Sequence, residues 1–102
     1  MTIELKIKLT LWEIKSNHKS SGKELFEELR YEMQYGEKDF RNYIEELANK
    51  GFIKIFGPNK DDFGDLSLTI DGEKLLAFSE EEKLDIILDY CTLRHKYIKI
   101  WF

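Results

Sequence analysis

Cys91 and His95 are the pair of side chains whose types and spacing come closest to metal chemistry. Residues four positions apart lie on the same face of a helix, and a thiolate and an imidazole are both zinc ligands. One such pair supplies only two of four ligands, so a zinc site would need a second copy of the chain. A cysteine that packs as a small apolar residue in a helix interface is the alternative that we favour. We therefore expect no metal and no cofactor.

The other polar residues do not form a recognisable catalytic set. The sequence contains two histidines and one cysteine, and it has neither a Ser/His/Asp arrangement nor a glycine-rich phosphate loop. Most of the acidic residues have the spacing of helix-surface positions, where a solvated face explains them better than acid–base catalysis. We therefore expect that the protein is not an enzyme.

Length and composition predict one folded domain over residues 1–102. The hydrophobic fraction is 42% and the aromatic fraction 14%, which is typical of globular proteins. With 20 acidic and 16 basic residues the net charge is −4, which disfavours nucleic-acid binding over the whole surface. No apolar run approaches the roughly 20 residues needed to cross a membrane, and no secretion signal is visible. We expect a cytoplasmic protein with no membrane contact.

The segment from residue 2 to about residue 17 carries two apolar patterns. Alternating hydrophobic residues, as in a strand, are Ile3, Leu5, Ile7, Leu9 and Leu11. Residues with helical spacing are Ile3, Ile7, Leu11 and Ile14. Periodicity alone leaves both structures open. We favour a helix because the segments that follow need a third helix to bury their apolar faces.

Two amphipathic helices are predicted between residues 21 and 50. Ser21 and Glu24 have the spacing of a capping box, which predicts that a helix begins there. Its apolar face is formed by Leu25, Phe26, Leu29 and Met33. The next helix runs from about residue 37 to residue 50, and Gly51 follows as a C-terminal stop. Its apolar residues have the spacing i, i+3, i+4, i+7: Phe40, Tyr43, Ile44 and Leu47.

A β-hairpin and further helical segments are predicted after Gly51. The strands are residues 52–56 and 66–70, joined by a loop that is rich in turn-forming residues. Asp71 is expected to cap a short helix. Ser79 and Glu82 have capping-box spacing and would begin a long helical segment over residues 79–102. A strand over residues 97–102 is the alternative for the end of this segment.

This order of elements resembles a winged-helix domain, and three stretches of sequence carry the resemblance. Residues 21–29 look like the second helix of that family, and residues 40–53 look like its third helix running into the wing. Residues 68–76 look like the second wing strand and the following helix of MarR-like and PadR-like regulators. The resemblance covers about residues 9–76. It implies a mostly helical α+β fold with a three-helix core, a β-hairpin wing and an additional C-terminal helix.

The resemblance also implies a homodimeric transcriptional regulator that binds double-stranded DNA. The third helix would enter the major groove, and the hairpin loop would contact the phosphate backbone. The residues expected to contact DNA are Lys38, Arg41 and Asn42 on the third helix, Lys60 in the loop and Lys23 on the second helix. Arginine can pair with guanine, asparagine with adenine, and lysine with phosphates.

The charges of the same region support an alternative function. Between residues 20 and 50, five basic residues face eight acidic ones, and the third helix begins with Glu37, Lys38 and Asp39. Carboxylates repel phosphates, and winged helices also serve as protein-interaction modules. The alternative is therefore an adaptor with an acidic surface, a protein partner and no direct DNA contact. It gains support if the acidic residues Glu37, Asp39, Asp61 and Asp62 share a face with Arg41 and Lys60.

Apolar residues of the first and last segments are expected to form the dimer interface. The residues concerned are Leu5, Leu9, Trp12, Ile86, Tyr90, Leu93, Tyr97 and Trp101. One small domain has difficulty burying both apolar faces, and a large exposed patch usually marks an interface. In the resembled regulators the first and last helices build the dimer. The alternative is that the last helix folds back over the core.

Overall fold

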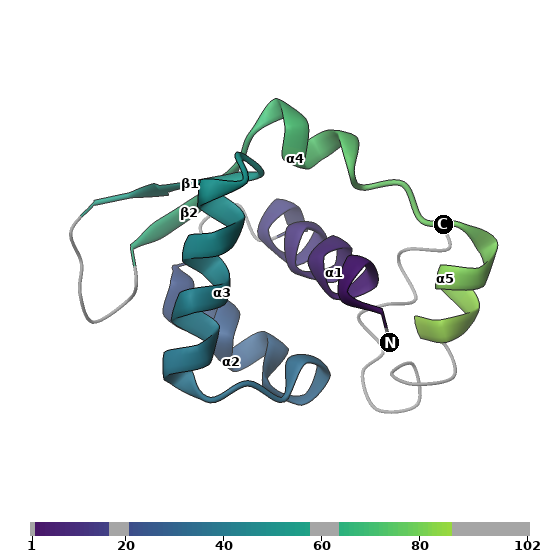
Figure 1. The fold of residues 1–102 in the computed structure, drawn as a ribbon, viewed down its shortest axis with the longest axis horizontal. Helices are drawn as coiled ribbons and strands as arrows, with labels where there is room; N and C mark the ends of the chain where they lie inside the picture. Colours follow the sequence, from purple (N-terminus) through teal and green to yellow (C-terminus); the bar gives the residue numbers. More distant parts are fainter. Residues whose placement is uncertain (1, 17–20, 58–63, 87–102) are drawn as a thin grey trace.

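The computed structural model describes residues 2–16, 21–57 and 64–86. Within these ranges three helices precede an antiparallel hairpin, and two short helices follow it (Figure 1). The elements are α1 (Ile3–Ser16), α2 (Gly22–Met33), α3 (Glu37–Asn49), β1 (Ile53–Phe56), β2 (Asp65–Leu68), α4 (Ile70–Lys74) and α5 (Glu80–Ile86). The predicted mostly helical α+β class is confirmed, and the order of elements is consistent with winged-helix topology.

The first segment is a helix, as favoured, and its burial explains why the sequence showed two patterns. Leu5, Leu9 and Leu11 are fully buried, although they do not lie on one narrow stripe of α1. Thr10 and Glu13, on further positions around the helix, are also buried. A helix that is covered on several sides is apolar on several sides, so its sequence loses a simple amphipathic period. Figure 1 shows α1 at the centre, between α3 with the hairpin and α5.

The core is completed by one face of α2, one face of α3 and the inner face of the hairpin. Buried residues from these elements are Leu25, Leu29, Met33, Phe40, Ile44, Leu47, Ile53 and Leu66. The rings of Phe26 and Phe40 lie 5.3 Å apart and join α2 to α3. The apolar stripes predicted for these two helices are therefore the ones that the core uses.

The hairpin is fixed by its register and by a bond to the start of α2. Ile53 pairs with Leu68 and Ile55 with Leu66, which places these alternating side chains on one face of the sheet. On the other edge of β2, Gly22 N–H donates to Gly64 O at 2.9 Å, next to a bridge between Ser21 and Asp65. The loop end of β2 is thereby hydrogen-bonded to the first turn of α2.

The junction between β2 and α4 differs from the prediction. The strand ends at Leu68, and the residue that caps α4 is Thr69, not Asp71. Thr69 Oγ1 accepts from Gly72 N–H at 3.0 Å and donates to Gly51 O at 2.5 Å. One hydroxyl thus satisfies two backbone groups, which Asp71 could not do because a carboxylate has no proton to donate. Ile70, predicted as a strand residue, begins the helix.

A complete capping box begins α5, as predicted. Glu82 N–H donates to Ser79 Oγ at 3.1 Å, and Ser79 N–H donates to Glu82 Oε1 at 2.9 Å. The same carboxylate oxygen accepts from Lys8 Nζ at 2.8 Å, and Lys8 also donates to Ala77 O at 2.9 Å. Lys8 therefore joins α1 to the chain leading into α5. The rest of the predicted C-terminal segment lies outside the described residues.

Candidate nucleic-acid interface

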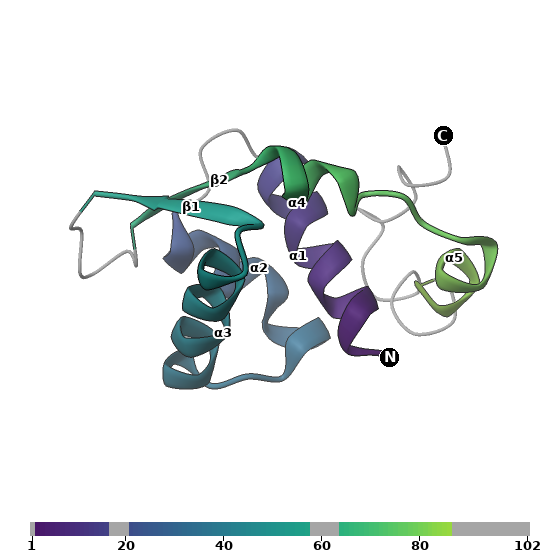
Figure 2. The ribbon, with the colours of Figure 1, turned by 45° about the horizontal axis from the view of Figure 1, so that its top comes forward.

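The outward face of α3 is the surface on which the predicted DNA contacts can be assessed. Phe40, Ile44 and Leu47 face the core, so the opposite side of the helix is in solvent. Tyr43 anchors α3 to α1, because its hydroxyl lies 2.8 Å from the Thr10 hydroxyl. Figures 1 and 2 show the hairpin extending from the end of α3, away from α5. The outward face of α3 and the hairpin thus belong to the same end of the molecule.

Four exposed polar residues form a line along α3 opposite the buried stripe. They have the spacing i, i+4, i+7, i+11 and are Lys38, Asn42, Glu45 and Asn49. Within the described part of the chain, none of these four side chains makes a hydrogen bond or an ion pair. We call them the unpaired line. The helix rise places its two ends about 16 Å apart, or about five base-pair steps of 3.4 Å.

Two ion pairs border the unpaired line. Arg41 lies 3.5 Å from Glu37 on one side, and Lys50 lies 3.5 Å from Glu46 on the other. Both pairs are exposed at i, i+4 spacing, where a salt bridge adds little stability. Their effect is to reduce the positive charge that Arg41 and Lys50 offer to an approaching anion. Glu37 and Arg41 therefore share one face, which is one part of the arrangement that favours the adaptor hypothesis. Asp39, two positions before Arg41, lies on the other side of the helix, and Lys60, Asp61 and Asp62 lie outside the described residues.

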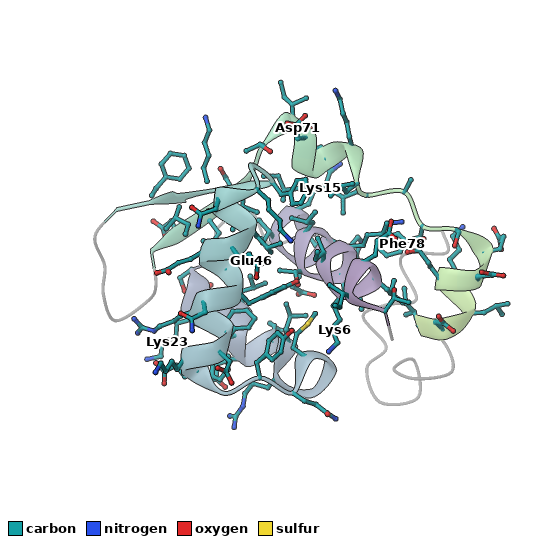
Figure 3. All side chains as sticks on the ribbon, in the orientation of Figure 1. Lys6, Lys15, Lys23, Glu46, Asp71 and Phe78 are labelled. Atoms are coloured by element: carbon teal, nitrogen blue, oxygen red, sulfur yellow. The ribbon has the colours of Figure 1, made fainter. Side chains whose placement is uncertain are left out.

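The predicted DNA-contacting residues are brought together only in part. Lys38 and Asn42 lie on the unpaired line, and Arg41 lies beside it in its ion pair. Lys23 is exposed at the start of α2, and Figure 3 shows it at the hairpin end of the molecule, far from Phe78. Lys60 lies outside the described residues.

Glu45 and Asn49 were not identified from the sequence as candidate site residues. Their spacing in the sequence could have indicated them. They follow Lys38 by seven and eleven positions, which places them opposite the apolar stripe that contains Phe40. A pattern of positive charge does not reveal this line, because half of it is asparagine and one member is acidic.

The outer face of the hairpin carries a shallow hollow of about 680 Å³. Phe56 and Ile70 at this hollow are 52% and 75% exposed, which is unusual for large apolar side chains. Lys54 and Asp71 also line it. This surface offers apolar contacts of the kind found in protein interfaces.

The structure corrects the expected position of three residues assigned to the dimer interface. Leu5, Leu9 and Ile86 are 0% exposed within one chain, so they belong to the core and not to a spare apolar face. Trp12 is half-buried and packs against the same core. Tyr90, Leu93, Tyr97 and Trp101 lie outside the described residues. Self-association itself stays a prediction.

Among the described residues, no group of three or more histidine, cysteine, aspartate or glutamate side chains could hold a metal ion. Cys91 and His95 lie outside those residues. In the same part of the chain, no helix has the length and apolar character needed to span a membrane.

Comparison of the chain with protein-family models, curated proteins and solved structures finds no match.

Proposed function

We propose that the protein is a winged-helix transcriptional regulator, related to the MarR-like and PadR-like type, that binds duplex DNA through α3 and the hairpin. The observation that carries the proposal is the unpaired line on α3. It combines an exposed helix face, side chains able to contact base edges, and a neighbouring hairpin in the order that winged helices use.

The charges of α3 determine the kind of DNA binding that is proposed. Around Lys38 and Arg41 the helix also exposes Glu37, Asp39 and Glu45, so the attraction to phosphates is weak. The affinity for DNA would then depend more on contacts with the bases than on contacts with the phosphate backbone of the DNA. We expect weak binding to random duplexes and a shallow dependence of affinity on salt concentration.

Fluorescence anisotropy with labelled duplexes at two salt concentrations tests this function. The duplexes are random DNA and the DNA upstream of the protein's own gene. We expect specific binding at about 10⁻⁸ M or tighter to one of them. Lys38→Ala and Asn42→Ala should weaken that binding, whereas Lys74→Ala, which removes an exposed cation from α4, should not. Absence of binding to either duplex at low salt, with the protein folded, would contradict the proposal.

We also propose that the regulator is a homodimer. Ile3 and Leu84 are exposed apolar side chains on α1 and α5, at the end of the molecule away from the hairpin. Pairing through that end would leave both copies of α3 open to a two-fold symmetric DNA site. Sedimentation equilibrium should give twice the mass of the chain, and Ile3→Glu with Leu84→Glu should halve it. A monomer at all concentrations would overturn this part.

A protein-interaction module remains the second candidate function, because two observations favour it. The Glu37–Arg41 pair lowers the positive charge of α3, and Phe56 with Ile70 offers an apolar surface on the hairpin. A photo-crosslinking amino acid at position 56 or at position 42 separates the two functions. The adaptor hypothesis expects protein adducts from position 56 and no DNA adducts from position 42, and the regulator hypothesis expects DNA adducts from position 42.

A further inference from the structure

Glu45 occupies the middle of the unpaired line, where its negative charge would repel the phosphates of bound DNA. Asn42 precedes it by three positions and Asn49 follows it by four, so no cation lies next to it along the line. The nearest arginine in sequence, Arg41, is paired with Glu37. Within the described residues Glu45 has no ion pair of its own, so its charge is brought close to the phosphates if α3 enters the major groove.

The chemistry of a carboxylate limits what it can bind there. An ionised carboxylate only accepts hydrogen bonds. In the major groove guanine offers the acceptors N7 and O6 and thymine offers O4. Cytosine offers the N4 amino group as a donor, and adenine offers its N6 amino group beside the acceptor N7. Adenine N7 would face the carboxylate acceptor to acceptor, so cytosine is the base that suits it best. A carboxylate at the centre of the contact therefore either repels DNA of every sequence or selects for cytosine.

We propose that Glu45 is a specificity-determining residue that accepts a hydrogen bond from the N4 amino group of a cytosine, an inference that rests on the proposed DNA-binding function. Asn42 is about 4.5 Å from it along the helix axis, close to one base-pair rise of 3.4 Å. Asparagine pairs with adenine N6 and N7. The recognised sequence then contains a cytosine within one or two base pairs of an adenine.

Glu46 provides a matched control for this assignment. It has the same charge and is the next residue on the same helix, but it pairs with Lys50 at 3.5 Å and lies beside the unpaired line. Glu45→Gln and Glu46→Gln remove equal charge from α3. A change in sequence preference that occurs with Glu45→Gln alone is therefore not a general electrostatic effect.

The test is selection of binding sites from a random duplex library by the full chain and by each variant. The wild-type protein should enrich a motif with a cytosine. Glu45→Gln should lower the preference for cytosine at that one position by roughly 5- to 150-fold and shift it to adenine, which glutamine can recognise. Glu46→Gln should leave the motif unchanged. Circular dichroism confirms that the three proteins have the same helix content.

Two results would overturn the inference in distinguishable ways. If both variants bind every sequence more tightly and keep the wild-type motif, Glu45 only repels DNA and the cytosine contact is wrong. If the wild-type protein enriches no sequence and binds no duplex at low salt, the proposed DNA-binding function itself fails, and the role of Glu45 fails with it.

Discussion

The hydroxyls of Tyr43 and Thr10 lie 2.8 Å apart, although the two residues are 33 positions apart in the chain. Thr10 Oγ1 also lies 2.8 Å from Lys6 O, to which it donates its only proton. Tyr43 is then the donor to Thr10. Burial raises the pKa of the Tyr43 phenol far above its ordinary value, so it keeps that proton throughout the physiological range. Together with the buried stripe of Phe40, Ile44 and Leu47, this bond holds the rotation of α3 about its own axis and therefore the direction of its outward face.

Tyr43→Phe should destabilise the fold by about 0.5–1.5 kcal/mol, because one buried hydrogen bond is lost while the ring stays in place. Urea unfolding measures the change. The control is Tyr35→Phe, since the Tyr35 ring contacts Tyr43 at 5.5 Å but its hydroxyl makes no hydrogen bond within the described residues. Equal effects of the two substitutions would show that the Thr10 contact adds nothing.

The contribution of Glu82 to stability should depend on pH. Desolvation opposes ionisation of this carboxyl, but hydrogen bonds from Lys8 and Ser79 and the Lys8 charge outweigh it and lower its pKa. A group whose pKa is lower in the folded state stabilises the protein above its unfolded pKa and loses that contribution as pH falls through its folded pKa. Glu82 therefore stabilises the fold at neutral pH and not in strong acid.

Glu82→Gln should cost about 1–2 kcal/mol at pH 7, and the difference from wild type should disappear below the ordinary glutamate range. Thermal unfolding at pH 7 and at several acid pH values measures the difference. Glu81→Gln, at an exposed position in the same helix turn, is the control and should have little effect at any pH. A loss that is equal at all pH values would mean that the ion pair is not its cause.

Gly72→Ala should destabilise the protein by about 2–4 kcal/mol. A Cβ atom at Gly72 would stand 2.1 Å from Phe52 O, so α4 would have to move away from the hairpin. Gly36→Ala is the matched control, because nothing lies within 4 Å of its added methyl group and its φ is −72°. Its cost should be at most about 1 kcal/mol, from the weaker helix cap. Denaturant unfolding distinguishes the two sites.

Glu37→Gln should make DNA binding more sensitive to salt, if the proposed function holds. The substitution removes the Glu37 carboxylate that lies 3.5 Å from Arg41, so less of the guanidinium charge is neutralised and its attraction to a phosphate increases. One added phosphate contact steepens the plot of log affinity against log salt by about 0.9. The double variant Glu37→Gln with Arg41→Ala should return the slope to the wild-type value. An unchanged slope in the single variant would show that Arg41 does not reach the backbone.

The parts of the fold that sequence predicted best are those governed by local spacing. Phe40, Ile44 and Leu47 defined α3, and Gly51, with φ of +84°, ends it as expected. The cap of α4 was placed wrongly because Thr69 gains its advantage from Gly51 O, which is remote in sequence. The Lys8–Glu82 pair joins residues 74 positions apart, and no local pattern indicates it.

The candidate site was predicted in part for a similar reason. Lys38 and Asn42, which the resemblance placed among the DNA contacts, do lie on the outward face of α3. The pairing of Arg41 with Glu37 depends on side-chain geometry, which helix spacing permits but does not require.

The bond from Gly22 N–H to Gly64 O affects the order in which the chain can fold during synthesis. When the ribosome has released only the first three helices, the first turn of α2 has no acceptor for this amide, and the core lacks Leu66. Contacts between distant residues form only after the intervening chain is available, and their closure slows folding. The helical half of the protein therefore completes its structure only when translation has passed the second strand.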